Sequence, residues 1–299
     1  MTAAAPAVRD VPRFEPALMR RRLTGTAFYG ACLLAIALLL LTLVALLVDV
    51  FVRAAPWLDI QFLTGVPSSR PSRAGVLPAM VGTLEIGLIV GLITFPIGVA
   101  AAIYFVEYAS DSRLNRLLQT NISNLAGVPS IIYGILGLAL FVRALALGPT
   151  VLAGALTLSL LILPVVIIAS IEALKAVPAG QREGAYALGA TRWQMVRRSV
   201  LPAAAPGILT GIILAMARAI GEAAPLIIIG AFTFVTFLPN PLAGQYTVLP
   251  IQIYGWALRP QEDFQGISAA GIVVILGLML VLNALALLIR ARLSRHIQW

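Results

Sequence analysis

The sequence predicts an all-α, polytopic membrane protein with six transmembrane helices. Three observations support this fold class. Hydrophobic residues make up 60% of the 299 residues and charged residues only 11%, whereas soluble domains contain roughly a half and a quarter. Apolar runs long enough to cross a hydrocarbon core about 30 Å thick recur along the chain. The basic residues lie mostly between these runs.

The predicted spans are six apolar runs, at residues 27–48, 80–106, 122–147, 150–171, 205–238 and 268–289. The first run follows Arg20, Arg21 and Arg22 and resembles a signal peptide at its start. It is too long for a signal core, and no small-residue cleavage pattern directly follows it. We therefore interpret this run as an uncleaved first span.

The distribution of positive charge predicts the orientation. If the N-terminus is cytoplasmic, 15 of the 21 Lys and Arg residues fall on the cytoplasmic side. The positive-inside rule therefore predicts a multi-pass protein of the plasma (inner) membrane with both termini in the cytoplasm. The predicted divisions are an N-terminal tail (1–26), a first span with an extracytoplasmic loop (27–79), a core (80–289) with a cytoplasmic loop (172–204), and a C-terminal tail (290–299).

Two proline-rich stretches, at residues 49–79 and 239–267, form the predicted extracytoplasmic loops. Their proline spacing excludes long helices. Trp57 and Trp256 near these loops are typical of an aromatic belt at the membrane surface. The net charge of +9 belongs to a membrane protein, so we expect membrane lipid and no nucleic acid as a partner.

The residue inventory argues against several kinds of chemistry. The single cysteine, Cys32, lies in the first apolar run, and the single histidine, His296, lies in the basic C-terminal tail. These residues make a metal site or an intramembrane nucleophile with a histidine base untenable. The only lysine, Lys175, lacks the preceding glycines of a phosphate-binding loop. We therefore expect no catalytic site, metal or ATPase in this chain.

The stretch from Pro178 to Pro202 is the most informative part of the sequence. Gly189 is suited to end one short helix in the left-handed conformation. Thr191 and Gln194 have the spacing of a capping box that starts a second helix. On that second helix one face would carry Trp193, Val196 and Val200. Composition alone is also consistent with an ordinary amphipathic helix at the membrane surface.

The spacing within this stretch resembles the EAA loop of ABC importer permeases. The matching residues are Glu183, Ala185, Gly189, Leu201 and Pro202. Gly184 and Ser199 depart from that pattern. The resemblance implies a type I ABC importer permease fold, in which this loop is the coupling helix that docks on an ATPase subunit. A helix on a glycine hinge, anchored by its neighbouring spans, can transmit a rigid-body movement.

Further stretches resemble the phosphate-specific Pst permeases, in particular the PstA-type subunit. They lie at residues 82–84, 95–98, 126–131, 153–158, 187–191, 218–226 and 247–250. The resemblance implies import of inorganic phosphate with a second homologous permease subunit, two nucleotide-binding ATPase subunits and an extracytoplasmic phosphate-binding protein. It also implies that ATP and Mg bind on the ATPase subunits, and that this chain binds no cofactor.

The fifth predicted span carries the candidate substrate pathway. Arg218 and Glu222 are four residues apart and would share a helix face. Pro225 lacks an N–H and would leave the carbonyl of Gly221 without its helical partner. Arg218 would offer a fork of donors to a passing oxyanion, and Glu222 would hold that fork when the site is empty. The alternative is an ion pair that only fixes helix packing. Glu85 is a second intramembrane charge, which either pairs with an arginine of the partner permease or lies at the interface.

Two other functions compete with phosphate import. A permease of the same superfamily for molybdate, sulfate or phosphonate would contain the same loop. An ion-coupled secondary transporter would contain inverted repeats and broken helices in matching halves, and the sequence shows no such pairing.

Overall fold

A computed structural model of the chain describes residues 18–231, 234–240 and 244–294. Most of the predicted N-terminal tail, with Arg9 and Arg13, lies outside the described residues, as do Arg295 and His296 of the C-terminal tail. The chain divides into two compact units, Met1–Asp49 and Val50–Trp299. In the first unit, the described residues belong to the apolar helix α1, which runs from Leu18 to Ala54 and so continues for five residues into the second unit.

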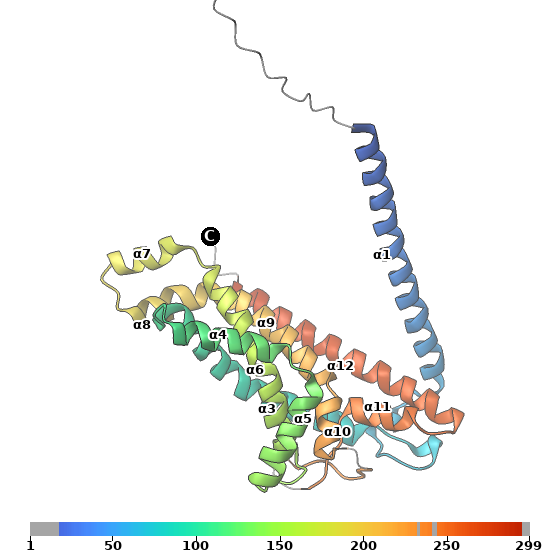
Figure 1. Cartoon of the computed structure of the whole chain (residues 1–299). Helices are drawn as coiled ribbons and strands as arrows, with labels where there is room; N and C mark the ends of the chain where they lie inside the picture. Colours follow the sequence, from blue (N-terminus) through green and yellow to red (C-terminus); the bar gives the residue numbers. More distant parts are fainter. Residues whose placement is uncertain (1–17, 232–233, 241–243, 295–299) are drawn as a thin grey trace, which may run out of the picture. The chain divides into compact units, whose positions relative to one another are not determined.

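The second unit is built from helices and the loops between them (Figure 1). Its helical segments are η1 (Ala55–Trp57), α2 (Ile60–Thr64), η2 (Pro71–Arg73), α3 (Leu77–Ile103), η3 (Tyr104–Tyr108), α4 (Arg113–Ala126), α5 (Ser130–Gly137), η4 (Leu138–Ala144), α6 (Val151–Lys175), α7 (Ala179–Ala187), α8 (Arg192–Met195), η5 (Val196–Val200), α9 (Leu201–Gly221), α10 (Ala224–Ile229), α11 (Leu249–Ala257) and α12 (Glu262–Ser294).

In the part of the chain that the structure describes, five helices are long and apolar enough to cross a membrane: Arg21–Trp57, Leu77–Tyr108, Val151–Lys175, Arg192–Gly221 and Glu262–Arg292. A sixth crossing is formed if the bent pair Arg113–Ala126 and Ser130–Ala144 counts as one span. The chain is therefore an all-α, multi-pass membrane protein, as predicted. In the proline-rich stretch 239–267, the described residues before the start of α12 form one helix, the nine-residue α11.

The prediction of one continuous third span at residues 122–147 is wrong. The two helices α4 and α5 meet there at an angle of 101°. Gly127 ends α4, and Pro129, with φ −54° and ψ 134°, precedes the first residue of α5. Proline has no N–H to donate and disfavours a helical conformation in the residue before it. The apolar composition therefore predicted a span correctly as a segment that suits a membrane, but it did not indicate the break in the helix.

The prediction of a fifth span at residues 205–238 is also wrong at both ends. The helix begins 13 residues earlier, at Arg192, and ends at Gly221. The short helix α10 follows, and Gly230 ends it with φ +99°. The remaining residues up to Val248 that the structure describes form no further helix. Proline at position 225 interrupts the helical hydrogen bonding that apolar composition alone suggested would continue.

The helix α6 forms the centre of the second unit, where it packs against α3 and α9. Close approach to α9 depends on small residues. A Cβ on Gly211 would lie 2.4 Å from the Cβ of Ala169, and one on Gly207 would lie 2.9 Å from that of Ala173. Small residues at such positions let helix backbones approach closely in a membrane. In Figure 1, α7 and α8 lie at one end of this body, and α10 and α11 lie toward the other end.

Candidate functional site: a broken helix and a hinged loop

The fifth span is interrupted beside its only charged pair. The helix α9 ends at Gly221, and Glu222 has extended dihedral angles, with φ −78° and ψ 122°. The helix resumes as α10 at Ala224, with Pro225 in its first turn. This confirms that the helix is loosened near Pro225, because an interior proline removes a backbone hydrogen bond. The break is complete, whereas a loosened turn was predicted.

Arg218 and Glu222 form an ion pair across this break. The Nε atom of Arg218 lies 3.4 Å from Oε1 of Glu222. The predicted shared helix face is not the reason for the contact, since Glu222 lies just beyond the helix end. The Arg218 side chain remains 43% exposed within the chain, whereas that of Glu222 is 18% exposed. The guanidinium therefore has free edges that further acceptors can reach.

The segment after the break is held by close contact with α5. A Cβ on Gly134 of α5 would lie 2.7 Å from Cα of Pro225 and 3.0 Å from its carbonyl oxygen. The neighbouring Tyr133 donates from its hydroxyl to the carbonyl oxygen of Leu125, at 2.9 Å. This hydrogen bond ties α5 to the last turn of α4 across the bend. The break between α4 and α5 and the break between α9 and α10 thus lie close together, and Arg218 lies beside the second of them.

Glu85 lies eight residues into α3, about 12 Å from the start of that helix at 1.5 Å per residue. Its Oε2 atom is buried and has no hydrogen-bond partner among the described residues. A buried carboxylate oxygen without a donor is unfavourable. The described residues therefore supply no hydrogen-bond donor for this oxygen of Glu85.

At the other end of the body, α7 and α8 form the hinged loop that the sequence predicts. Gly189 has φ +80°, the left-handed conformation that glycine adopts at low cost. Thr191 starts the next helix with a capping box: its hydroxyl accepts from the N–H of Gln194 at 3.3 Å, and its own N–H donates to Gln194 Oε1 at 2.9 Å. Both local predictions are confirmed.

The second helix of this loop is not a separate element. It continues from Arg192 without interruption to Gly221, through a π-helical segment at Val196–Val200. Pro202, which cannot donate to the residue four positions before it, is the second residue after that segment. A π-helical turn accommodates such a residue and rotates the preceding turn. Val196 and Val200 are fully buried, whereas Trp193 is 54% exposed, so the predicted common face of all three is wrong.

An arginine that the sequence interpretation overlooked anchors the loop to the spans. Arg182 of α7 donates to Oε1 of Glu107 from Nε at 3.0 Å and from Nη2 at 2.8 Å. It also donates to the carbonyl oxygens of Val177 and Leu174, at 2.8 and 2.9 Å. The side chain of Glu107 is only 6% exposed. No local pattern indicated this contact, because the two residues are 75 positions apart.

The outer surface of the loop is exposed and partly apolar. Leu188 is 90% exposed, Trp193 54% and Tyr186 44%. Glu183 is also exposed on α7, and Ala185 packs against the buried cluster beneath it. Leu201 is partly buried and Pro202 exposed where α9 begins. Apolar side chains gathered on a protruding element are typical of a surface that binds another protein.

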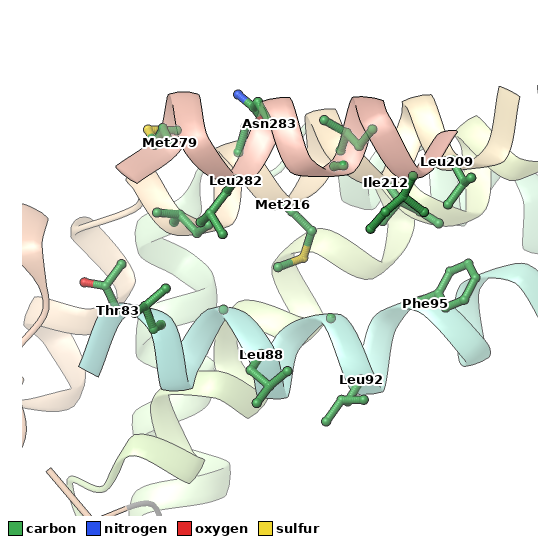
Figure 2. Close-up of a pocket in the computed structure, with 18 residues that line it drawn as sticks. Thr83, Leu88, Leu92, Phe95, Leu209, Ile212, Met216, Met279, Leu282 and Asn283 are labelled. Carbon is green, nitrogen blue, oxygen red and sulfur yellow. The ribbon is translucent and has the colours of Figure 1, made fainter. Parts of the chain in front are cut away.

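A cavity of about 640 Å³ in the second unit is a groove between α3, α9 and α12. Figure 2 shows Leu88 and Leu92 on α3 and the side chain of Met216 between the helices. The lining is almost wholly apolar, with Thr83 and Asn283 as its polar residues. Burial of a charged group in such a lining is costly. The groove is therefore unsuited to an anion.

A multi-pass helical body with an arginine beside a broken span and a protruding hinged loop defines the chain as a transport permease of the type I ABC importer fold. The chain belongs to the family of binding-protein-dependent transport system inner membrane components, which it matches over residues 94–295. It is therefore a multi-pass protein of the inner membrane and a permease subunit.

Several curated relatives support this assignment. The chain is 32% identical to the phosphate transport system permease protein PstA 1 of Mycobacterium tuberculosis, over 95% of this chain and 94% of the relative. It is 31% identical to a probable ABC transporter permease protein, YqgI, of Bacillus subtilis, over 90% and 95%. It is 38% identical to a second B. subtilis protein of that description, YqgH, over 64% of each chain.

Solved structures support the fold. A bacterial ABC transporter involved in the import of the acidic polysaccharide alginate contains a chain that matches with a TM-score of 0.66 and 18% identity, over 92% of this chain and 98% of that chain. The inward-facing MetNI methionine ABC transporter contains another, with a TM-score of 0.55 and 21% identity, over 75% and 95%.

Proposed function

We propose that this chain is the permease subunit of an ATP-driven importer that carries inorganic phosphate across the plasma membrane. The observation that carries the proposal is the Arg218 guanidinium, 43% exposed beside the break after α9. A half-exposed guanidinium fork suits an oxyanion with several acceptor atoms. Support for phosphate comes from the PstA 1 relative, which matches over nine-tenths of this chain.

In the proposed pathway, Arg218 is the substrate-facing cation and Glu222 its resting partner. The ion pair holds the guanidinium in place at 3.4 Å when no anion is present. An arriving phosphate offers stronger, charge-assisted acceptors to the same N–H groups. Because Glu222 has extended backbone and lies outside both helices, a small rotation of α10 would move it away from Arg218. The competing role, an ion pair that only fixes packing, predicts no effect on substrate choice.

The hinged loop is the proposed contact with an ATPase subunit. Glu183 would provide a polar contact, and the exposed Leu188 and Trp193 an apolar one. Gly189 would let α7 tilt relative to α8, while Leu201 and Pro202 join the loop to α9. Movement of the loop would therefore reach Arg218 along one continuous helix, Arg192–Gly221. ATP and Mg would bind on the two ATPase subunits.

The proposal includes a second homologous permease subunit and an extracytoplasmic phosphate-binding protein. Both termini and the α7–α8 loop would be cytoplasmic, because the basic residues gather in those segments. The buried, unpaired oxygen of Glu85 would then face an arginine of the second permease. The proposal keeps the predicted divisions of the chain: the N-terminal tail (1–26), the first span with its loop (27–79), the core (80–289) with its cytoplasmic loop (172–204), and the C-terminal tail (290–299).

Uptake by the purified complex in liposomes tests the function. ATP inside, with the phosphate-binding protein outside, should drive accumulation of radiolabelled phosphate. Excess sulfate, molybdate or phosphonate should leave that uptake unchanged. If one of these anions is accumulated instead, the chain is a permease for that oxyanion. Accumulation driven by a proton or sodium gradient without ATP would make it a secondary transporter.

Glu222 also provides a test of how phosphate is distinguished from sulfate. Near neutral pH phosphate carries a proton that Glu222 can accept in a hydrogen bond, whereas sulfate has none. The variant Glu222→Gln should therefore lose preference for phosphate over sulfate. If phosphate uptake and rejection of sulfate both match the unaltered protein, Glu222 has no such role.

A further inference from the structure

Another cavity, with a partly polar lining, lies at the end of the body opposite the α7–α8 loop. It encloses about 280 Å³ and is lined by residues before and within α11, among them Thr247, Gln252 and Trp256, and by Arg259 just after that helix. The helix α11 packs against α12 and α3. The cavity is thus separate from the pair Arg218 and Glu222, neither of which lines it.

Three of the lining side chains are polar groups buried within the protein. Thr247 and Trp256 are each 1% exposed, and Gln252 is 8% exposed. The hydroxyl of Thr247 and the indole N–H of Trp256 have no hydrogen-bond partner among the described residues. Leaving a buried donor without an acceptor is unfavourable. Both atoms expose less than 1 Å² to solvent, so a bound acceptor reaches these two donors once their side chains turn toward the cavity.

Among the described residues that line the cavity, the one charged residue is a cation. Arg259 lies with its guanidinium carbon 4.3 Å from the centre of the Phe264 ring, which holds the group in place. Among residues 18–231, 234–240 and 244–294, no carboxylate forms an ion pair with Arg259. A guanidinium, an amide, a hydroxyl and an indole N–H can all donate, and no lining residue carries negative charge.

We propose that this cavity is an oxyanion-binding site that receives phosphate at the extracytoplasmic end, before the anion reaches Arg218. The step from an oxyanion to phosphate rests on the proposed function of the chain. The four donors match the several acceptor oxygens of a tetrahedral oxyanion, and Arg259 matches its charge. The same chemistry would also accept the phosphate group of a phospholipid, so the experiment separates the two sources.

Equilibrium binding of radiolabelled inorganic phosphate tests the site directly. The full chain, purified with its partner subunits but without the phosphate-binding protein, is placed in nanodiscs of phosphatidylcholine. Arg259→Gln should raise the dissociation constant at least about tenfold, because a charge-assisted contact is lost. Thr247→Val removes the hydroxyl at nearly constant side-chain volume, and Trp256→Phe removes the indole N–H together with part of the ring system. Each should raise the dissociation constant about threefold or more.

Two arginine variants serve as controls. Arg143→Gln removes an exposed arginine that does not line the cavity and should leave binding unchanged. Arg218→Gln reports on the pathway site: phosphate binding in the cavity should persist in this variant while transport is lost. Repeating the assay in a maltoside detergent, which contains no phosphate, identifies the source. If a lipid phosphate group occupies the cavity, the affinity for free phosphate should be lower in phosphatidylcholine than in the detergent.

Wild-type affinity in Arg259→Gln, Thr247→Val and Trp256→Phe together would overturn the proposal, provided that each variant keeps the melting temperature of the unaltered complex. Binding that disappears in Arg218→Gln but not in Arg259→Gln would overturn it while leaving the proposed function intact. Conversely, the complex could bind phosphate in the cavity and yet transport another substrate. That result would contradict the proposed function and leave the cavity proposal intact.

Discussion

Arg182 and Glu107 join the hinged loop to the end of the second span through two N–H groups on one carboxylate oxygen, at 3.0 and 2.8 Å. The same guanidinium binds two carbonyl oxygens at the C-terminal end of α6. Three elements, α7, η3 and the end of α6, therefore meet at one side chain. Any tilt of α7 would be passed to these spans as well as along α9.

Replacing Arg182 should uncouple ATP hydrolysis from transport. Arg182→Ala leaves the 6% exposed Glu107 without its partner, and removal of one member of a buried pair costs about 3 kcal/mol. Arg182→Lys keeps the charge but loses the fork of donors. In proteoliposomes, both variants should hydrolyse ATP with fewer phosphates imported per ATP.

The nearby pair of Arg116 and Asp111 is the matched control, since its side chains are 65% and 83% exposed at 3.4 Å. Arg116→Ala should change stability by less than about 1 kcal/mol and leave the transport ratio intact. An unchanged ratio in Arg182→Ala, with normal expression, would show that this pair only stabilises the fold.

Arg218 should be essential for transport but not for assembly. Arg218→Gln removes the donor fork and should lower the phosphate uptake rate at least about tenfold. Arg218→Lys should recover only part of that rate, because a single ammonium cannot bind two oxygens in the same geometry. Uptake is measured at several phosphate concentrations, with copurification of the other subunits as the control. Uptake at the normal rate in Arg218→Gln would show that the ion pair of Arg218 and Glu222 only fixes helix packing.

Gly189 and Glu183 should act in coupling to the ATPase. Gly189→Ala introduces no clash, since nothing lies within 4 Å of the added atom, but φ +80° costs a non-glycine residue about 1 kcal/mol. We expect a stiffer hinge and slower uptake. Glu183→Ala should weaken copurification of the ATPase subunit. The double variant is decisive, because full-rate phosphate import by that complex would exclude the loop from the transport cycle.

Gly134 should be sensitive to the smallest enlargement. Gly134→Ala would place an atom 2.7 Å from Pro225 and 3.1 Å from Ile228, which pushes α10 away from α5. Overpacking of this kind costs about 1 to 3 kcal/mol. Gly127→Ala is the control, as its nearest neighbour is 3.5 Å away. Thermal unfolding of the purified complex should show a lower midpoint for Gly134→Ala only.

Local patterns predicted the hinged loop well. The left-handed Gly189 and the capping box of Thr191 and Gln194 depend on residues within a few positions of each other, so the sequence contains the whole interaction. The predicted spans at 122–147 and 205–238 failed for a related reason. Apolar composition measures whether a segment suits a membrane, but it does not report the hydrogen bonds that Pro129 and Pro225 interrupt.

The amino-acid pattern was enough to establish an all-α, multi-pass membrane permease and the loop that marks its family. The folded chain was needed to show that Arg182 contacts Glu107, that Trp256 is buried within the protein, and that Thr247, Gln252 and Arg259 share a cavity. Hydrophobicity and capping act between neighbours along the chain. Ion pairs and cavities depend on how distant segments pack, which no local pattern records.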